Sequence, residues 1–338
     1  MLLKILKRRK AFGIAIASVL LILPNNLFSQ QGKKVNELVS TFSIVASDPE
    51  TGEVGVAVAS RFFSVGSVVP WAKADVGAVA TQSFANTSFG WRGLELMEKG
   101  AEPEEIVNIL LRTDDNPSQR QFGIVSADGK SATYTGENCL PWAGGRNGKN
   151  YAVQGNILTG EDVVIAMEES FINTKGTLAD RMFAALTAGN GKGGDSRGKQ
   201  SAALIVFKTG AGYGGYNDRA IDIRVDDHAE PFDELGRILN IAQMNYAWNE
   251  GWTLFMNKKY TEALPHIERA VKLDPDYPEL LYDAAVIRLA AGQKENAVDA
   301  IIEALKLNPN LKKSALGDND LKGLIDNQRF VNFLNTLK

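Results

Sequence analysis

Short apolar runs separated by turn residues dominate the chain between residues 40 and 235. Thr41–Ala46 alternates between polar and apolar positions, the segment 48–52 (DPETG) favours a turn, and Val54–Ser60 forms a second apolar run. Two such runs joined by turn residues predict a β-hairpin. Comparable runs predict further strands at 76–82, 121–126, 132–135, 151–154, 201–208 and 221–225.

Segments with helical spacing lie between these strands. They occur in pairs, 90–99 with 104–112 and 161–171 with 178–188, and Pro103 stands where a helix favours proline in its first turn. Strands at both ends with helix pairs between them predict an α+β domain in which helices cover largely antiparallel sheets.

A repeat of 34 residues follows from residue 239 onward. The positions that match at this offset are Trp248 with Tyr282, Gly251 with Ala285, Ala263 with Ala297, Ala270 with Ala304, Leu273 with Leu307 and Pro275 with Pro309. A helix-turn-helix unit of this length, with small residues at the helix contact and a closing proline, resembles the tetratricopeptide repeat.

The repeat places an all-α domain at residues 239–338. Its units are 244–277 and 278–311, with 239–244 joining the front and 318–338 acting as a cap, because such units are stable only when stacked. Two uses stay open for this domain: binding a partner protein, or packing on the first domain as a structural appendage.

The first 29 residues have the order of a secretory signal. Five cationic residues between Lys4 and Lys10 precede the uncharged run 11–23, which is too short to span a bilayer comfortably. We expect a cleaved signal peptide, residues 1–29, cut near Ser29, with an uncleaved membrane anchor as the alternative. Removing five positive and no negative charges changes the net charge from −3 to −8. The expected protein is exported, periplasmic or secreted, and has no stable membrane span.

Composition narrows the chemistry. The 338 residues include one cysteine and only two histidines, His228 and His266. This excludes an internal disulfide, a three-histidine zinc site and an HExxH helix. The acidic balance argues against a nucleic-acid partner. We therefore expect no metal and no cofactor, and chemistry carried by hydroxyls, amides, carboxylates or guanidinium groups.

Several runs of the first domain form a recognisable set. They are TFSIVA (41–46), GVAVASRF (55–62), VPWA (69–72), GAVATQ (77–82), QGN (154–156), GGDSRGKQSAAL (193–204) and RVDDH (224–228). Together they resemble a bacterial family known as domain of unknown function 1028 (DUF1028), which is grouped with the N-terminal nucleophile (Ntn) hydrolases. The resemblance covers about residues 41–234 and is most specific at 193–204. It implies a four-layer αββα sandwich at residues 40–235 and says little about substrate.

The same resemblance makes Thr41 the candidate nucleophile, with Ser43 and Arg61 beside it. Ntn hydrolases start their first strand with Thr, Ser or Cys, and a cut just before that residue frees an amine that serves as the general base. A signal peptidase acting near Ser29 leaves residues ahead of Thr41, so the mechanism requires a second cut after Ser40. Thr41 and Ser43 can equally be ordinary strand hydroxyls.

One part of the expected machinery is missing. The segment 56–61 resembles the second strand of proteasome-type subunits, in which an acidic residue precedes a Ser-Arg pair and a lysine follows one strand later. Here Ala59 stands at the acidic position, and the nearest lysine downstream is Lys73. Arg61 remains available to lower the pKa of the amine or to hold an anion.

Polar residues at strand ends are the candidates for substrate binding. Amides able to stabilise an oxyanion or bind polar groups follow small-residue strands, and a glycine-rich loop leads into a strand. The candidates are Gln82, Asn86, Gln154, Asn156, Asp195, Arg197, Gln200 and Ser201. The loop can also be a tight connection in which Asp195 and Arg197 pair with each other.

Three functions follow from these observations. The first is an exported amide or peptide hydrolase with a threonine nucleophile, acting on a small amide or peptide. The second is a non-catalytic domain that binds a ligand in the same cleft. The third is an assembly factor whose repeats bind a protein partner.

Overall fold

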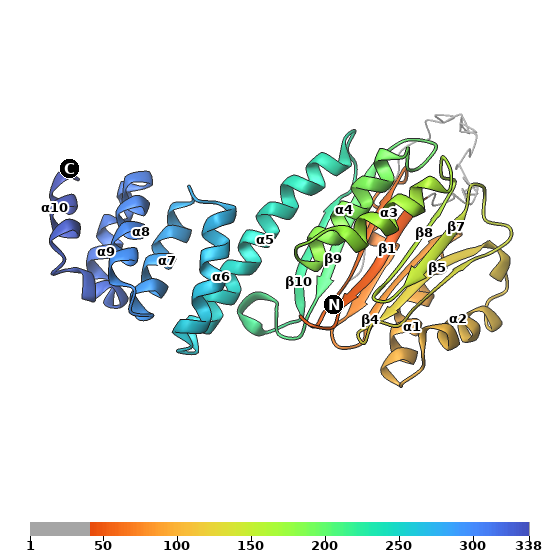
Figure 1. The fold of residues 1–338 in the computed structure, drawn as a ribbon, viewed down its shortest axis with the longest axis horizontal. Coiled ribbons are helices and arrows are strands. Elements are labelled where there is room, and N and C mark those ends of the chain that lie inside the picture. Colours follow the sequence, from red (N-terminus) through yellow and green to blue (C-terminus); the bar gives the residue numbers. More distant parts are fainter. Residues whose placement is uncertain (1–40, 338) are drawn as a thin grey trace, which may run out of the picture. The chain divides into compact units, whose positions relative to one another are not determined.

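The computed structural model describes residues 41–337, and its first domain contains two antiparallel sheets (Figure 1). The six-stranded sheet has the order β10 (Arg219–Val225), β9 (Ser201–Phe207), β2 (Glu53–Ser60), β1 (Thr41–Asp48), β8 (Tyr151–Asn156), β7 (Gly144–Gly148). The four-stranded sheet has the order β3 (Pro70–Lys73), β4 (Gly77–Ser83), β5 (Arg120–Ser126), β6 (Ser131–Thr135).

The hairpin predicted from residues 41–60 forms as β1 and β2, with Thr41 opposite Ser60 and Asp48 opposite Glu53. Strands β3 and β7 were not predicted. β7 consists of GGRNG, which has no β-branched or aromatic residue, and it forms because β8 pairs with it along its whole length.

Alternation along β1 divides its side chains between two cores. Phe42 and Ile44 belong to the core beneath the helices, whereas Val45 belongs to the core shared by the two sheets. Odd-numbered residues of β1 therefore face the other sheet, as the period of two requires. Thr41 and Ser43 lie on this inter-sheet face.

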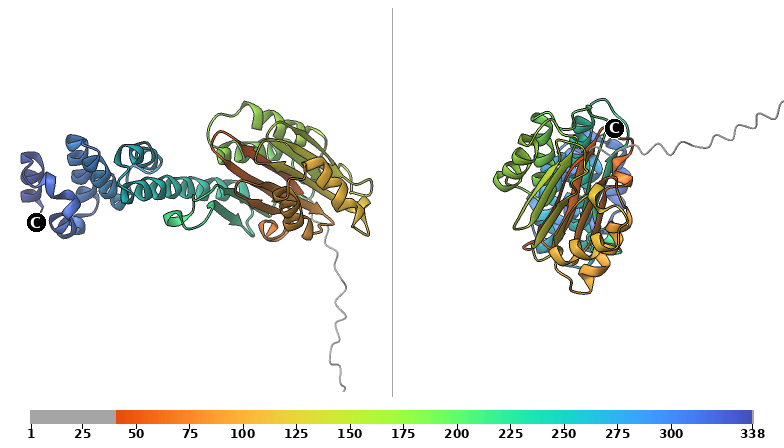
Figure 2. Two further views of the ribbon diagram at one scale, coloured as in Figure 1. Left: turned by 90° about the horizontal axis from the view of Figure 1, so that it is seen from below. Right: turned by 90° about the vertical axis from the view of Figure 1, so that its right-hand side faces the viewer.

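Helices lie on the outer faces of both sheets (Figure 2). α3 (Asp162–Asn173) and α4 (Leu178–Gly191) pack on the six-stranded sheet, while α1 (Ser88–Glu98) and α2 (Pro103–Arg112) pack on the four-stranded one. The mixed domain with two antiparallel sheets agrees with the prediction.

The C-terminal region is entirely helical, as predicted. Its helices are α5 (Pro231–Met256), α6 (Tyr260–Leu273), α7 (Pro278–Ala290), α8 (Lys294–Leu307), α9 (Lys312–Gly317) and α10 (Gln328–Thr336). Small buried residues of the 34-residue repeat, such as Ala263 and Ala297, lie in the cores of the two helix pairs. Phe330 of α10 closes the last core.

Helix α5 joins the two regions without a break. It runs from Pro231 to Met256 and so crosses residues 235–239, where the sequence placed the boundary between domains. Phe232, Leu235 and Leu239 pack in the core beneath α3 and α4, whereas Met244 and Ala247 belong to the first repeat. One helix therefore contributes to both cores.

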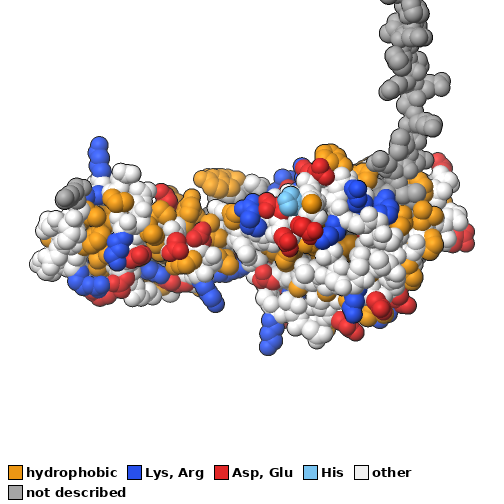
Figure 3. Space-filling view, turned by 90° about the horizontal axis from the view of Figure 1, so that it is seen from above, with side chains coloured by type: hydrophobic (Ala, Val, Ile, Leu, Met, Phe, Trp, Pro, Cys, Tyr) orange, Lys and Arg blue, Asp and Glu red, His pale blue; other side chains and the backbone are white. Residues whose placement is uncertain are grey.

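The signal predicted at residues 1–29 lies outside the described residues. Within residues 41–337, no helix is both long and apolar enough to cross a membrane. Acidic and basic side chains are interspersed on the face drawn in Figure 3.

Candidate functional site

Strand ends from both sheets meet at one end of the inter-sheet layer. Thr41 pairs with Ser60 on one side and with Asn156 on the other. In the four-stranded sheet, Gln82 pairs with Gln121, close to the end of β4 and the start of β5. The antiparallel registers thus bring the start of β1 together with the ends of β2 and β8. The end of β4, in the other sheet, lies next to them because Gln82 donates to the carbonyl oxygen of Thr41.

This end of the layer is lined by polar side chains, and we call it the polar end. Its members are no more than 2% exposed: Thr41, Ser43, Ser60, Gln82, Gln121, Gln154 and Asn156. The rest of the layer is mostly apolar, and we call it the apolar end; it consists of Val45, Val56, Val58, Ala78, Ala80, Val125, Ala152, Ala203 and Ile205, with Val65 and Val69 beside them and the buried hydroxyl of Ser47 at its far edge. Buried polar groups are costly unless they are hydrogen-bonded, so the contacts at the polar end matter.

Ser43 connects amides from both sheets. Its hydroxyl donates to Oε1 of Gln82 at 2.6 Å and accepts from Nε2 of Gln154 at 2.6 Å. Gln82 Nε2 in turn donates to the carbonyl oxygen of Thr41 at 3.1 Å and to Oε1 of Gln121 at 2.9 Å. Gly123 leaves the room for this arrangement, because a Cβ there would lie 2.1 Å from Oε1 of Gln154.

Gln121 is a member of the site that the sequence did not single out. Its Nε2 donates to the carbonyl oxygen of Gly155 at 2.7 Å, and its Oε1 accepts from Nδ2 of Asn156 at 2.8 Å. The available signal was a glutamine at the start of the strand predicted at residues 121–126. Recognising it required the register of two strands far apart in sequence.

Thr41 begins β1 at the edge of the polar end. Its hydroxyl donates to the hydroxyl of Ser60 at 3.2 Å, and its side chain is fully buried. Ala59 belongs to the core beneath the helices, so a carboxylate at that position would point away from Thr41. Lys73 pairs with Gly77 at the opposite end of β4 and forms an ion pair with Glu98 at 2.5 Å. Neither position supplies a charge to Thr41.

Two residues with left-handed backbone directly follow members of the polar end. Ser83 has φ 66° and follows Gln82, while Ile157 has φ 52° and follows Asn156. Positive φ at a β-branched residue such as Ile157 is unusual and strained. Strain of this kind clusters at functional sites, where surrounding contacts hold it in place.

The loop 193–200 covers the same end of the six-stranded sheet. The amide of Ser196 donates to the carbonyl of Ile157 at 3.0 Å, and that of Gln200 donates to the carbonyl of Ser60 at 3.1 Å. The loop therefore bridges β8 and β2, the two neighbours of β1.

Asp195 is the centre of this loop. Its side chain is 1% exposed and accepts from the backbone amide of Arg61 at 2.8 Å and from that of Arg197 at 2.9 Å. The guanidinium of Arg197 also donates to Asp195 at 3.2 Å and to the carbonyl of Arg61 at 3.1 Å. Asp195 and Arg197 therefore pair with each other. Both also bond the backbone of Arg61, and in this way they hold the residue that directly follows β2.

Gln200 and Ser201 complete the loop in different ways. Gln200 accepts from the guanidinium of Arg61 at 2.8 Å and donates to Asp227 at 3.1 Å. Ser201 is fully buried, donates to the carbonyl of Phe62 and accepts from the amide of Val65 at 3.1 Å. Ser201 therefore fastens the segment after β2.

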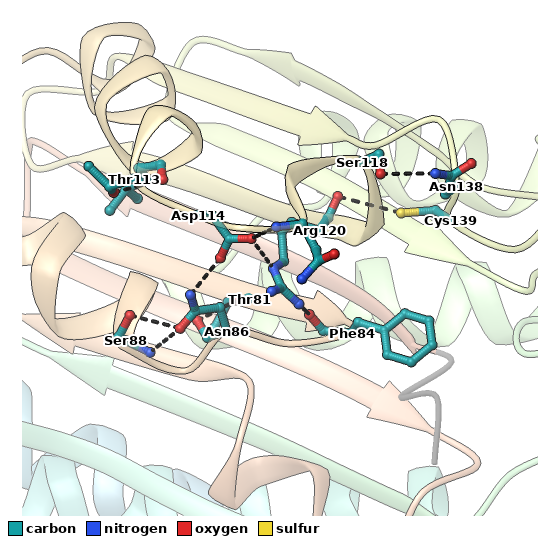
Figure 4. A network of polar contacts seen from close by, with 12 residues as sticks. Thr81, Phe84, Asn86, Ser88, Thr113, Asp114, Ser118, Arg120, Asn138 and Cys139 are labelled. Carbon is teal, nitrogen blue, oxygen red and sulfur yellow. Dashed lines mark hydrogen bonds and ion pairs between the residues drawn. The ribbon is translucent and has the colours of Figure 1, made fainter. Parts of the chain in front are cut away.

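Asn86 lies in a separate network beside the polar end (Figure 4). It donates to Asp114 at 2.7 Å and accepts from the amide of Ser88 at 3.1 Å, while Arg120 bonds Asp114 at 2.9 Å and the carbonyl of Phe84 at 2.6 Å. Burial acts to raise the pKa of Asp114, but the bonds from Asn86, the backbone of residue 116 and Arg120 lower it on balance. This network fixes the loop that follows Gln82.

The described residues contain no group of three or more His, Cys, Asp or Glu arranged to hold a metal ion. The groups at the polar end are neutral amides and hydroxyls, with the buried carboxylate of Asp195 and the guanidinium of Arg197 in the adjoining loop and the guanidinium of Arg61 directly after β2. Such a set can bind polar groups and support attack by a hydroxyl.

Comparisons with known proteins agree with this division of the chain. The model of the family of unknown function DUF1028 matches residues 41–235, and a tetratricopeptide-repeat model matches residues 254–315. The crystal structure of a DUF1028 protein from Silicibacter pomeroyi is similar, with 30% identity and a TM-score of 0.55 over 60% of this chain and 89% of that one. No curated protein matches the chain.

Proposed function

The chain belongs to the DUF1028 family. We propose that it is an exported amide or peptide hydrolase whose nucleophile is Thr41. The observation that carries the proposal is the polar end. A threonine begins the central hairpin there, surrounded by buried amides, at an edge with strained backbone on two sides. A domain without a site would not need to bury so many polar side chains together.

The layer order supports an Ntn-type mechanism. Two facing sheets with helices on their outer faces are compatible with an αββα sandwich, and Thr41 begins β1, as the proposed mechanism requires. A cut between Ser40 and Thr41 would free the α-amine. This amine would take the proton from Oγ1 while the oxygen attacks the carbonyl carbon of an amide.

The surrounding residues have distinct proposed roles. Gln82 and Gln154 hold the backbone and the neighbouring hydroxyl of Ser43 in place, because their side-chain N–H groups already donate to β1. Arg61 directly follows Ser60, the residue that pairs with Thr41, and its positive charge would favour the neutral form of the amine or attract an anionic part of the substrate. Arg197 is paired with Asp195 and holds the loop. Asn86 acts through the loop that it fixes.

The protein's own N-terminus provides the test. Intact mass and N-terminal sequencing of the mature chain should show a chain that starts at Thr41, and Thr41→Ala should prevent the cut. Ser47→Ala is the matched control, because Ser47 is a buried hydroxyl on the same strand and the same face, at the other end. A mature chain that starts near Gln30 and ignores both substitutions would exclude the nucleophile role.

A second candidate is a ligand-binding domain without catalysis. The observation that favours it is the placement of the two residues at the positions expected to carry the supporting charges: Ala59 belongs to the other core, and Lys73 lies at the far end of β4. A chain that remains uncut but binds a small amide, and loses this binding in Asn156→Ala, would support this candidate.

The tetratricopeptide repeats suggest a protein interaction. We propose that this region recruits the protein partner while the DUF1028 domain acts on the small molecule. An assembly factor in which only the repeats function is the remaining alternative.

A further inference from the structure

A polar pocket lies where the DUF1028 domain meets the first repeat. Its volume is about 780 Å³, and it is lined by the β1–β2 turn, the start of α4, and helices α5 and α6. This volume falls in the range of small-molecule sites, roughly 300–1,000 Å³. It lies around Asp48 and Glu53, at the opposite end of the β1–β2 hairpin from Thr41.

The two walls of this junction pocket differ in charge. The DUF1028 wall presents three carboxylates, Asp48, Glu53 and Asp180, beside one ammonium, Lys208. The α6 wall presents Arg269 and Lys272, with His266 at the same spacing of three residues, so these side chains form one row along the helix.

The walls are joined at one point by a neutral bridge. Gln243 donates to Asp180 at 2.7 Å and accepts from Arg269 at 2.8 Å. Lys208 and Glu250 add an ion pair at 3.7 Å, and His266 bonds Glu250 at 3.0 Å. The bridge and these pairs set the distance between the acidic and the basic wall.

Two buried polar groups, Tyr246 and Glu53, line the pocket. Tyr246 is 7% exposed, and burial, the charges of Glu250 and Glu53 and a hydrogen bond with Glu250 raise the pKa of its hydroxyl. Glu53 is 8% exposed, accepts from the hydroxyl of Thr51 at 3.3 Å and has its pKa raised by burial. A phenol oxygen that donates its proton to a carboxylate can still accept from an ammonium group.

We infer that the junction pocket binds a short peptide with a free amino and a free carboxyl terminus. The ammonium lies against Glu53 and the hydroxyl of Tyr246, and the carboxylate lies against Arg269 and Lys272. A simple cation or anion would satisfy only one wall, whereas a zwitterion satisfies both. The pocket is distinct from the Thr41 site and does not depend on its chemistry.

The test is calorimetric titration of the full mature chain carrying Thr41→Ala, so that hydrolysis cannot interfere. The probes are trialanine, its N-acetyl form, its C-terminal amide and the doubly blocked peptide. Trialanine should bind, and the doubly blocked peptide should bind at least about tenfold more weakly, because charge-assisted hydrogen bonds are the stronger ones. A Thr41→Ala chain that binds trialanine in this way supports the pocket whether or not the Thr41 proposal holds.

Two variants identify the walls through a crossed pattern. Glu53→Gln should weaken trialanine roughly tenfold but leave the N-acetyl peptide unchanged, and Arg269→Gln should weaken trialanine but leave the C-terminal amide unchanged. Glu98→Gln on α1 is the charge-matched control and should change nothing. Absence of binding, equal affinity for all four peptides, or equal loss for all four in a folded variant would each overturn the inference.

Discussion

The two ends of the inter-sheet layer are built from the same strands but bury opposite chemistry. At the apolar end, Val45, Val56 and Val58 pack against the four-stranded sheet without any polar partner to satisfy. At the polar end, Ser43 of β1, Gln82 of β4 and Gln154 of β8 are equally buried, and they depend on one another for hydrogen bonds.

The two ends differ in how their side chains contribute to the stability of the fold. An apolar layer is stable in many combinations of side chains, provided that volume is conserved. A buried amide network stabilises the fold only when every member is satisfied, and a partly satisfied one is worse than apolar packing. A layer selected for stability alone would have continued the valines to the strand ends, so the polar end points to a site.

The largest effect should come from breaking the polar end. Gln82→Ala removes the partner of Ser43, of the Thr41 carbonyl and of Gln121 together, and should lower the free energy of unfolding by about 3–4 kcal/mol. Val58→Ala at the apolar end should cost only about 2 kcal/mol, the loss of two methyl groups and a small cavity. Urea unfolding of both variants measures this. A larger cost for Val58→Ala would contradict the comparison.

The second effect concerns the loop that covers the polar end. Asp195→Asn keeps the size of the side chain but removes the charge that holds two backbone amides and Arg197. It should cost about 1–2 kcal/mol, because hydrogen bonds to charged groups are worth more than neutral ones. Hydrogen exchange at the Arg61 amide should speed up. The exposed Asp227→Asn is the control, and equal effects of the two variants would show that Asp195 does not anchor the loop.

The smallest effect uses pH to compare the polar end with Glu53, which lies at the opposite end of the β1–β2 hairpin. The polar end contains neutral amides and hydroxyls, whereas Glu53, at the start of β2, has its pKa raised by burial. The folded chain therefore binds this proton more tightly than the unfolded chain does, so this contribution to stability falls as pH rises from about 4.5 through the raised pKa.

Thermal melts across this range test that contribution. Glu53→Gln should flatten this part of the pH profile, whereas Gln82→Ala should shift the whole profile downward without changing its slope. An unchanged slope in Glu53→Gln would contradict the assignment.

The sequence predicted the fold where local patterns decide it. Alternation gave the β1–β2 hairpin, and the 34-residue offset gave the two helix pairs of the repeats. β3 contains a proline and β7 is rich in glycine, so both owe their structure to a neighbouring strand, which a local pattern does not reveal.

The candidate site was predictable only in part, for a related reason. Thr41, Ser43, Gln82, Gln154 and Asn156 were named from strand ends, and the structure brings them together. Gln121 joins them because β5 pairs with β4, a pairing between distant segments. Asn86 lies just after β4, the strand that contains Gln82, but its side chain bonds Asp114 in the network that also contains Arg120. Distance along the chain does not say which way a loop turns after its strand ends.

We propose Thr41 as the nucleophile of the polar end, and covalent trapping of its hydroxyl tests this proposal. A β-lactone acylates a nucleophilic hydroxyl by opening its own ring, which leaves an ester on the oxygen. Peptide mass spectrometry of the mature chain should find one adduct, on Thr41, that is lost in Thr41→Ala and kept in Ser47→Ala. An unmodified Thr41 at a free N-terminus, or an adduct on another residue instead, would contradict the account.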